Sequence, residues 1–289
     1  WVIMKIIDKI YSTSDKSIKV LQITNDNFII ETGVFDDGNT CHLCMSSQIG
    51  CPISCQMCYN GINKNFVRNL TFEEIKNQAI NIISSLNLLD QYEYICFSFM
   101  GVGEPLLNYE NVLKAIKYLN NKYENISFAL ATTLPNVGMI KTLTNDFNEI
   151  DKFKLTISLH ASNDRKRNEL IPVSSSMNSL RIAMDYYKKY SIHKGEFNYV
   201  LLKDFNDSEE DFLELLEFLE DDDRLKISTY NQIENSKFNK SSEEQYELLH
   251  KMLNERNIHN SKFESVGDKI DVGCGQMAAK KLERIMKNV

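Results

Sequence analysis

The chain has 289 residues, of which 43% are hydrophobic and 25% are charged, as in an ordinary globular protein. It contains no apolar run near the roughly 20 residues that a membrane span needs, and its N-terminus lacks the segments of a secretory signal. The formal net charge of −7 disfavours a nucleic-acid enzyme that relies on overall positive charge, because phosphate binding draws much of its affinity from Lys and Arg.

The first predicted elements are β-strands. Two β-rich runs, Ser17–Thr24 and Phe28–Phe35, flank a short Asn-Asp-Asn turn, and this pattern predicts a hairpin. A third strand, Cys41–Gln48, leads into a loop that is rich in cysteine. We therefore expect residues 1–40 to form a short N-terminal β extension and residues 41–289 to form the main domain.

Beyond this loop, helical and strand patterns alternate along the chain. A capping box, Thr71-Phe-Glu-Glu74, opens the first helix. Repeated strand–helix units with right-handed crossovers form a parallel sheet covered by helices, and six such units predict a partial (β/α)6 barrel, with its functional residues at the C-terminal strand ends. The expected strands are 92–100, 126–133, 153–160, 196–202, 225–232 and 262–266, and the expected helices are 71–89, 109–122, 137–144, 178–190, 208–220, 242–257 and 276–287.

The cysteine-rich loop places Cys51, Cys55 and Cys58 at the spacing C-x3-C-x2-C. Seven cysteines in a chain without an export signal indicate a reducing, cytoplasmic compartment, where thiols bind metals or take part in catalysis. A structural zinc site usually combines two C-x2-C pairs, and only one such pair is present. Three thiolates instead suit a [4Fe-4S] cluster with one iron left open. The spacing resembles that of the radical S-adenosylmethionine (SAM) superfamily, in which this iron binds SAM.

Polar residues follow several of the predicted strands. Gly103 and Glu104 end the second strand of the main domain, Ser158-Leu159-His160 end the fourth, and Asn231 ends the sixth. Taken singly, a Gly-Glu-Pro segment marks a turn, and a strand-end His or Asn commonly caps a loop. Because all of them fall on one edge of the sheet, a functional role becomes the better interpretation. The Gly-Glu-Pro segment resembles the one that receives the SAM amino group in the radical SAM superfamily, and this resemblance implies that these residues bind SAM, with Glu104 accepting a charge-assisted hydrogen bond from its ammonium group.

Longer motifs are similar to those of the RlmN/Cfr family of radical SAM enzymes. That family methylates C2 or C8 of adenine in large-subunit ribosomal RNA, and its RlmN members also act on transfer RNA. The resemblance spans about Glu31 to the C-terminus and implies a radical SAM barrel, an RNA substrate, an electron donor such as flavodoxin or ferredoxin, and a monomer. The matching segments are Cys44–Cys51, Phe66–Thr71, Met100–Asn108, Ser158–His160 and Ile270–Met277.

The resemblance also implies roles for two further cysteines and a glutamate. Cys274 would take a methyl group from one SAM, and a radical made from a second SAM would activate that methyl for addition to the ring. Cys44 would then release the product by forming a disulfide with Cys274, and Glu31 would accept the ring proton. Buried structural thiols are common, but the flanking Gly273 and Gly275 indicate a loop rather than a packed strand at Cys274.

The sequence departs from this family at two places. The family has a serine that contacts SAM where Ala131 aligns, and Thr132 or Thr133 could supply the hydroxyl instead. The family also carries an N-terminal helical domain that helps to hold RNA, whereas about 40 residues precede Cys41 here. Cys96 lies within an apolar strand and is expected in the core.

Three functions therefore remain open. The first is an adenine-methylating RNA enzyme, and the second applies the same methyl-cysteine chemistry to transfer RNA, a free nucleotide, a small molecule or a peptide. The third is a non-catalytic RNA-binding or iron–sulfur protein, although such a protein has no use for Cys44 and Cys274. The basic run Arg165-Lys166-Arg167 fits an RNA contact or a solvated face equally well.

Overall fold

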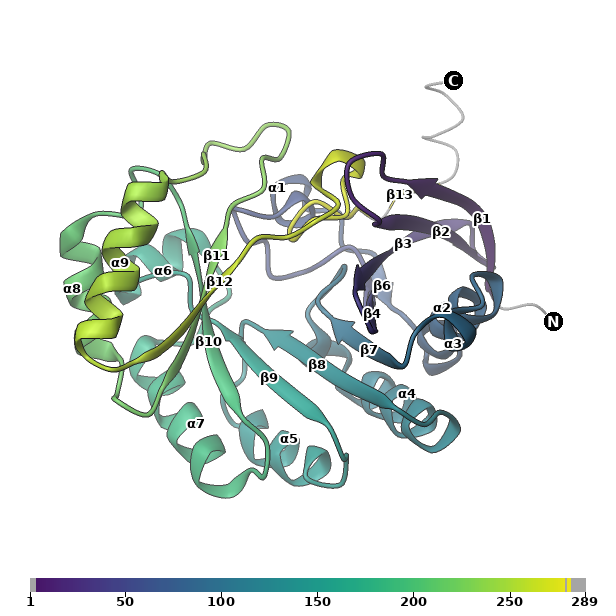
Figure 1. The fold of residues 1–289 in the computed structure, drawn as a ribbon, viewed down its shortest axis with the longest axis horizontal. Coiled ribbons are helices and arrows are strands. Elements are labelled where there is room, and N and C mark those ends of the chain that lie inside the picture. The colour runs from purple at the N-terminus through teal and green to yellow at the C-terminus, as the bar shows by residue number, and fades with distance from the viewer. Residues whose placement is uncertain (1–3, 279, 282–289) are drawn as a thin grey trace.

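The computed structural model describes residues 4–278 and 280–281. Its main sheet runs β1-β2-β3-β4-β7-β8-β9-β10-β11-β12, with β13 paired to β3. The pairings from β1 to β4 are antiparallel, and those from β4 through β12 are parallel. Figure 1 shows that β7–β12 curve around a central space with α4, α5, α7, α8 and α9 on the outside. This mixed α/β fold with a parallel sheet confirms the expected fold class, and the described pairings form an open path.

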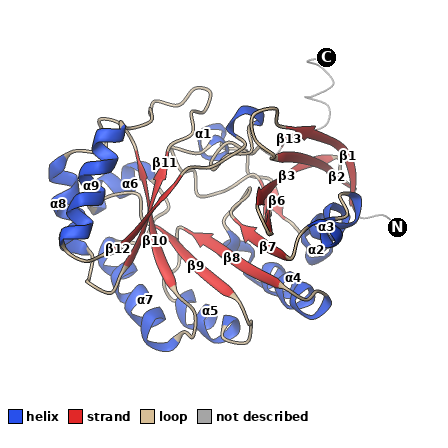
Figure 2. Cartoon of the chain, in the orientation of Figure 1, coloured by secondary structure: helices blue, strands red, loops and turns tan. Residues whose placement is uncertain are grey.

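The described part of the chain begins with five consecutive strands, and from β7 to β12 each strand is followed by one or two helices (Figure 2). The strands are β1 (Met4–Tyr11), β2 (Ile18–Thr24), β3 (Phe28–Asp37), β4 (Thr40–Cys44), β5 (Gln48–Ile49), β6 (Arg68–Asn69), β7 (Tyr94–Phe99), β8 (Ile126–Thr132), β9 (Phe153–Ser158), β10 (Gly195–Leu201), β11 (Arg224–Thr229), β12 (His259–Phe263) and β13 (Lys280–Lys281). The α-helices are α1 (Tyr59–Asn63), α2 (Phe72–Ser85), α3 (Leu88–Gln91), α4 (Tyr109–Lys122), α5 (Met139–Phe147), α6 (Asp164–Leu170), α7 (Met177–Tyr190), α8 (Glu209–Phe218) and α9 (Glu243–Glu255), and the 3-10 helices are η1 (Pro105–Asn108) and η2 (Asp268–Ile270).

The N-terminal strands extend the parallel sheet on one side. The expected hairpin is present as β2 and β3, which pair from Ile18↔Val34 to Ile23↔Ile29. A further strand, β1, pairs with β2, and sequence analysis assigns no strand to its residues. Most residues of β1 are exposed or half-buried, so they show little of the alternation by which a half-buried strand is recognised.

Local signals set several of the helix boundaries. The expected capping box opens α2, where the Thr71 hydroxyl accepts from the Glu74 N–H and the Glu74 carboxylate accepts from the Thr71 N–H. The helix ends at Ser85, earlier than expected, because Asn87 adopts a left-handed conformation before α3. At the other end of the chain, the helix expected over 276–287 is not present at its start: Gln276 lies in a turn and β13 follows. The rest of that range lies outside the described residues.

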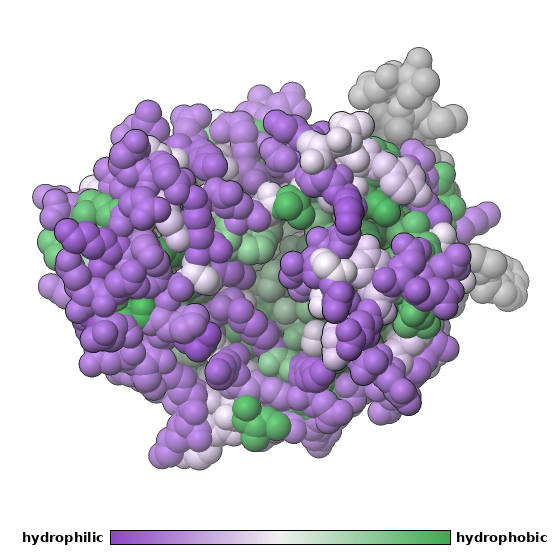
Figure 3. Space-filling view, viewed as in Figure 1, coloured by the Kyte–Doolittle hydropathy of each residue, from purple (hydrophilic) through white to green (hydrophobic). Residues whose placement is uncertain are grey.

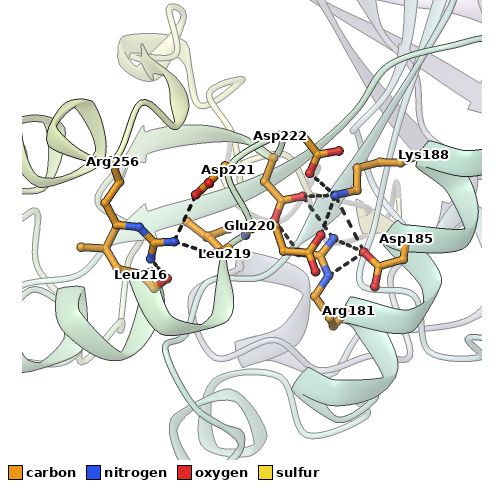
Figure 4. A network of polar contacts seen from close by, with 10 residues as sticks. Arg181, Asp185, Lys188, Leu216, Leu219, Glu220, Asp221, Asp222 and Arg256 are labelled. Carbon is orange, nitrogen blue, oxygen red and sulfur yellow. Dashed lines mark hydrogen bonds and ion pairs between the residues drawn. The ribbon is translucent and has the colours of Figure 1, made fainter.

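A network of charges holds the helices at the start of β11, at the opposite end of the strand from its C-terminal residues (Figure 4). Arg181 of α7 pairs with Asp223, which directly precedes β11, and Lys188 of α7 pairs with Glu220 at 3.0 Å. Arg256 at the end of α9 donates to backbone carbonyls at the end of α8. These contacts fix the start of β11. None of these charged residues lines the cavities described below. Among the described helices, none is long and apolar enough to cross a membrane.

Candidate active site at the carboxyl ends of the strands

Two adjoining cavities occupy the space inside the curved sheet, and Figure 3 shows the molecule hollowed at the centre of this face. The first has a volume of about 200 Å³ and is lined by strand ends and the cysteine-rich loop. The second has a volume of about 650 Å³ and is lined by the inward faces of the strands. The two cavities share four lining residues, Met100, Lys226, Phe263 and Cys274.

The three cysteines of the C-x3-C-x2-C loop all line the first cavity, so the structure brings them together as expected. The loop packs so closely against α1 that residue 61 must be glycine, because a Cβ there would lie 2.0 Å from the Cys55 carbonyl oxygen. Helix α1 begins directly after Cys58. The Tyr59 N–H at its start donates to the carbonyl of Gly275, 2.9 Å away, so this loop also contacts the C-terminal segment.

Burial governs the protonation of these thiols. It raises the pKa of Cys51 to about 12, and it raises the pKa of Cys55 and of Cys58 as well. The thiols are therefore neutral until a metal displaces their protons. Within the described part of the chain, no group of three His, Cys, Asp or Glu side chains is arranged to hold a single metal ion. In an iron–sulfur cluster each cysteine binds its own iron, and three thiols that line one cavity are compatible with that arrangement.

Gly103 and Glu104 are fixed at the end of β7 beside the cysteine loop. Gly103 has a φ of 112°, and a Cβ there would lie 2.7 Å from the Gln48 Cβ, so only glycine fits. The Glu104 N–H donates to Gln48 Oε1 at 2.8 Å. The Glu104 side chain lines the first cavity although it is only 3% exposed. Burial raises the pKa of this carboxyl, and hydrogen bonds from β8 and η1 partly oppose that rise.

Both threonines considered in place of the missing serine bind Glu104. The Thr132 hydroxyl donates to Glu104 Oε1, and the Thr133 hydroxyl and N–H donate to Oε2 at 2.9 and 2.8 Å. Ala131, Thr132 and Thr133 all line the first cavity. The hydroxyls therefore sit where a ligand in the cavity would meet them, while they also hold the carboxylate in place.

The residues after β9 turn sharply into the same cavity. Ser158 and His160 line it, whereas Leu159 is fully buried and is not among its lining residues. His160 has a φ of 56°, and its Nδ1 accepts from the Val200 N–H at 3.1 Å, so the ring carries its proton on Nε2. Burial lowers the pKa of His160 to about 3, and the positive charges of Arg167 and Lys226 lower it further. The imidazole is thus neutral at physiological pH.

Three hydrogen bonds, from helix α1 and from the residues after β11, fix the segment that carries Cys274. Asn231, which follows β11, lines the first cavity and donates to the Cys274 carbonyl at 3.0 Å. Asn60 of α1 donates to the Met277 carbonyl at 2.8 Å. Gly275 accepts from the start of α1, as described above. This segment forms a turn rather than a strand, in agreement with the expectation from the glycines around Cys274.

Cys44 and Cys274 both line the second cavity, and Cys274 also lines the first. Cys44 ends β4 and is buried, and that burial together with the neighbouring Cys274 raises its pKa. Cys274 is an exposed residue at the junction of the two cavities. Burial raises the pKa of this thiol, and the positive charge of Lys226 opposes that rise. All seven cysteines are free thiols in this structure.

Glu31 lies against the Cys274 segment but outside both sets of lining residues. Its carboxylate, on β3, is buried and accepts from the Ala278 N–H at 2.8 Å. The ammonium of Lys19 lies 3.6 Å from the same oxygen. The structure therefore does not bring Glu31 to the cavities with Cys44, and its carboxylate holds the chain four residues after Cys274.

Sequence analysis misses Lys226, and it places Cys96 correctly in the core without indicating that this residue also borders a cavity. Lys226 lies between apolar neighbours in β11, and a lysine at an inward position of a strand is the signal that could have revealed it. Cys96 is buried as expected, but it lines the second cavity. Burial alone would raise its pKa, but interactions with His42 and Ser127 outweigh it and lower the pKa.

Comparisons with known proteins agree with this geometry. A family model described as the radical SAM superfamily matches residues 45–218. A protein of Chlorobium phaeobacteroides, "Probable dual-specificity RNA methyltransferase RlmN", is 33% identical over 91% of this chain and 74% of its own length. One of the same name from Cytophaga hutchinsonii is 31% identical over 94% of this chain and 75% of its own length. The crystal structure of a radical SAM methyltransferase from Sphaerobacter thermophilus has a TM-score of 0.87 and 26% identity, covering 95% of this chain and 81% of that one.

Proposed function

This chain belongs to the RlmN family of the radical SAM superfamily, and from that premise we propose that it methylates C2 or C8 of an adenine in RNA through an S-methylcysteine. The observation that carries the proposal is the position of Cys274. It lines both the cavity of the three loop cysteines and the cavity of Cys44. A methyl group on its sulfur would therefore be within reach of the first cavity, and Cys44 would face it from the second.

The first cavity has the groups needed to hold the two cofactors. Cys51, Cys55 and Cys58 would bind a [4Fe-4S] cluster, and Glu104 would accept from the SAM ammonium group. Ser158, His160 and Asn231 reach the cavity directly, Thr132 adds a hydroxyl, and Gly103 leaves room for the ligand. Leu159 would support SAM binding only indirectly, because its side chain is buried behind the residues that line the cavity. When bound, the cluster and SAM together supply a 5′-deoxyadenosyl radical.

The two catalytic cysteines would act in different protonation states. Cys274 must be a thiolate to take a methyl group from the first of two SAM molecules used per turnover, and the nearby Lys226 favours that anion. Cys44 keeps its proton more strongly because it is buried beside Cys274. It would become a nucleophile only when the base is tethered to Cys274. Its attack would then form a Cys44–Cys274 disulfide and break the bond from the Cys274 sulfur to the methylene carbon, which keeps the electron pair and takes up a proton, so that the methylated base is released.

Two further events belong to the cycle. Before the bond between Cys274 and the substrate breaks, Glu31 would accept the ring proton, and for this its carboxylate must give up its hydrogen bond from the Ala278 N–H. An electron donor of the flavodoxin or ferredoxin type would supply electrons to the cluster, and the disulfide must be reduced before the next turnover.

The same chemistry on a non-ribosomal substrate remains the second candidate, and the charge of the chain favours its members that are not RNA. The net charge is −7, and the basic run on α6 offers little to phosphate: Arg167 is fully buried and Lys166 pairs with Asp211. Substrate affinity should fall steeply with salt if RNA phosphates are bound. Little dependence on salt would favour a free nucleotide, a small molecule or a peptide.

Transfer of a labelled SAM methyl group to RNA tests the proposal. Anaerobically reconstituted protein should label adenine, and Cys274→Ala should abolish the label because it removes the carrier sulfur. The matched control is Cys41→Ala, which removes a fully buried thiol from β4 that lines neither cavity. Full methyl transfer by Cys274→Ala would overturn the proposed role of this residue.

A further inference from the structure

Arg167 on helix α6 is a fully buried side chain with a charge. Such a guanidinium loses its hydration, and that loss is unfavourable unless an opposite charge compensates it. The neighbouring Lys166 has its own partner in Asp211 and lies nearer the surface. Arg167 therefore differs in burial and in partners from its neighbour Lys166, although the sequence Arg165-Lys166-Arg167 suggests one continuous basic patch.

The partners of Arg167 satisfy its hydrogen bonds but not its charge. Its guanidinium donates to the backbone carbonyls of Ser158, Leu159, Thr133 and Ser175, at 2.7 Å for Ser158 and 3.0 Å for Thr133. All four acceptors are neutral. No carboxylate among the described residues lies within ion-pair distance of it, although Asp164 on the same helix acts on it electrostatically, and burial lowers the pKa of Arg167 to about 10.

The cysteine loop, which packs against α6, is a candidate for the compensating charge. The Gln56 N–H donates to the Leu170 carbonyl at 2.8 Å, which joins the loop to the end of α6. Ser158 and Thr133, whose carbonyls accept from Arg167, line the same cavity as Cys55, so the guanidinium lies directly behind the wall of that cavity. Arg167 lines neither cavity. It therefore lies behind the loop, where it cannot contact SAM or substrate.

We propose that Arg167 is the internal counter-cation of the iron–sulfur cluster and sets its reduction potential. The inference rests on the proposed cluster of Cys51, Cys55 and Cys58. Three thiolates give such a cluster a net negative charge, and reduction adds a further electron. A fixed buried cation favours that added charge, and net charge is among the factors that set cluster potentials. Arg167 is a positioning residue, because it also holds the carbonyls of the turn that presents His160.

Three substitutions separate charge from shape. Arg167→Lys keeps the charge and loses the fork of hydrogen bonds, whereas Arg167→Gln loses both. Arg167→Met is a second neutral variant, in which an apolar side chain of similar length fills the site. Lys166→Gln is the control, because it removes a neighbouring cation that already pairs with Asp211.

The readout is the cluster midpoint potential, measured by an EPR-monitored redox titration. We expect the neutral variants to shift the reduction equilibrium at least tenfold toward the oxidised cluster, about 59 mV for one electron. Arg167→Lys should remain near the wild-type potential, as should Lys166→Gln. Thermal melting of each variant, recorded in parallel, reports the loss of the carbonyl contacts, which Arg167→Lys and Arg167→Gln share.

The outcomes distinguish this inference from the proposed function. Equal potentials in the wild type and the neutral variants, or equal shifts in the Lys and Gln variants, would leave only a structural role for Arg167. The proposed function would still stand in that case, because the wild type would contain its cluster. A wild-type protein that binds zinc, or no metal, under anaerobic reconstitution would overturn both.

Discussion

The neutral, buried His160 makes the folded protein sensitive to acid. Its pKa is about 3 in the folded chain against an ordinary value of 6.5, so between these values the unfolded chain binds one more proton. Stability therefore rises with pH in this window and is lost as the pH falls from 6.5 toward 3. Lowering the pH from about 7 to about 5 crosses roughly 1.5 units of the window, and at about 1.36 kcal/mol per unit this removes about 2 kcal/mol.

The substitution His160→Asn isolates this contribution. Asparagine tolerates the left-handed conformation that residue 160 adopts, and its Oδ1 can accept from the Val200 N–H in place of Nδ1. It does not titrate. Urea unfolding of the anaerobically reconstituted wild type and variant at the two pH values gives the change for each. We expect the variant to lose about 2 kcal/mol less than the wild type, and equal losses would refute a neutral His160.

Three further predictions concern the cofactor site and the Cys274 segment. Glu104→Gln should weaken SAM binding by about 1.5–3 kcal/mol, because a charge-assisted hydrogen bond is lost; isothermal titration calorimetry measures this, and an unchanged Kd would contradict the role of Glu104. Cys55→Ala should reduce the iron content from about four per chain to a small fraction, whereas Cys41→Ala should retain it; a full complement of iron in Cys55→Ala would exclude the proposed ligand set. Asn60→Ala removes the hydrogen bond to Met277, so limited proteolysis should cut the C-terminal segment faster while the melting temperature changes little; an unaltered cutting rate would show that Asn60 does not hold this segment.

The sequence was sufficient where chemistry depends on local spacing. Cys51, Cys55 and Cys58 lie close in the chain, so their shared cavity could be expected from the motif alone. The boundaries of α4 could also be predicted, because its hydrophobic period is regular and it follows a proline-led turn. Glu104 could be placed at the cavity because it directly follows a buried strand.

The properties that the sequence did not reveal depend on distant parts of the chain. Arg167 belongs to a basic run that is typical of a solvated face, and only the packing of α6 against the cysteine loop shows its burial. Cys96 lies in an apolar strand, and its lowered pKa follows from His42 on the adjacent strand β4. The contact of Glu31 with Ala278 joins residues that are 247 positions apart, which no local pattern can indicate.

The central claim is that Cys274 carries carbon to the substrate and that Cys44 releases it. Cys44→Ala should therefore stop turnover after the substrate is joined to Cys274. Mass spectrometry of tryptic and nuclease digests of this variant, after anaerobic reaction with SAM and RNA, should find an adenine nucleotide bound through a methylene group to the peptide containing Cys274. An unmodified Cys274 peptide together with normal methylation of RNA would contradict the account.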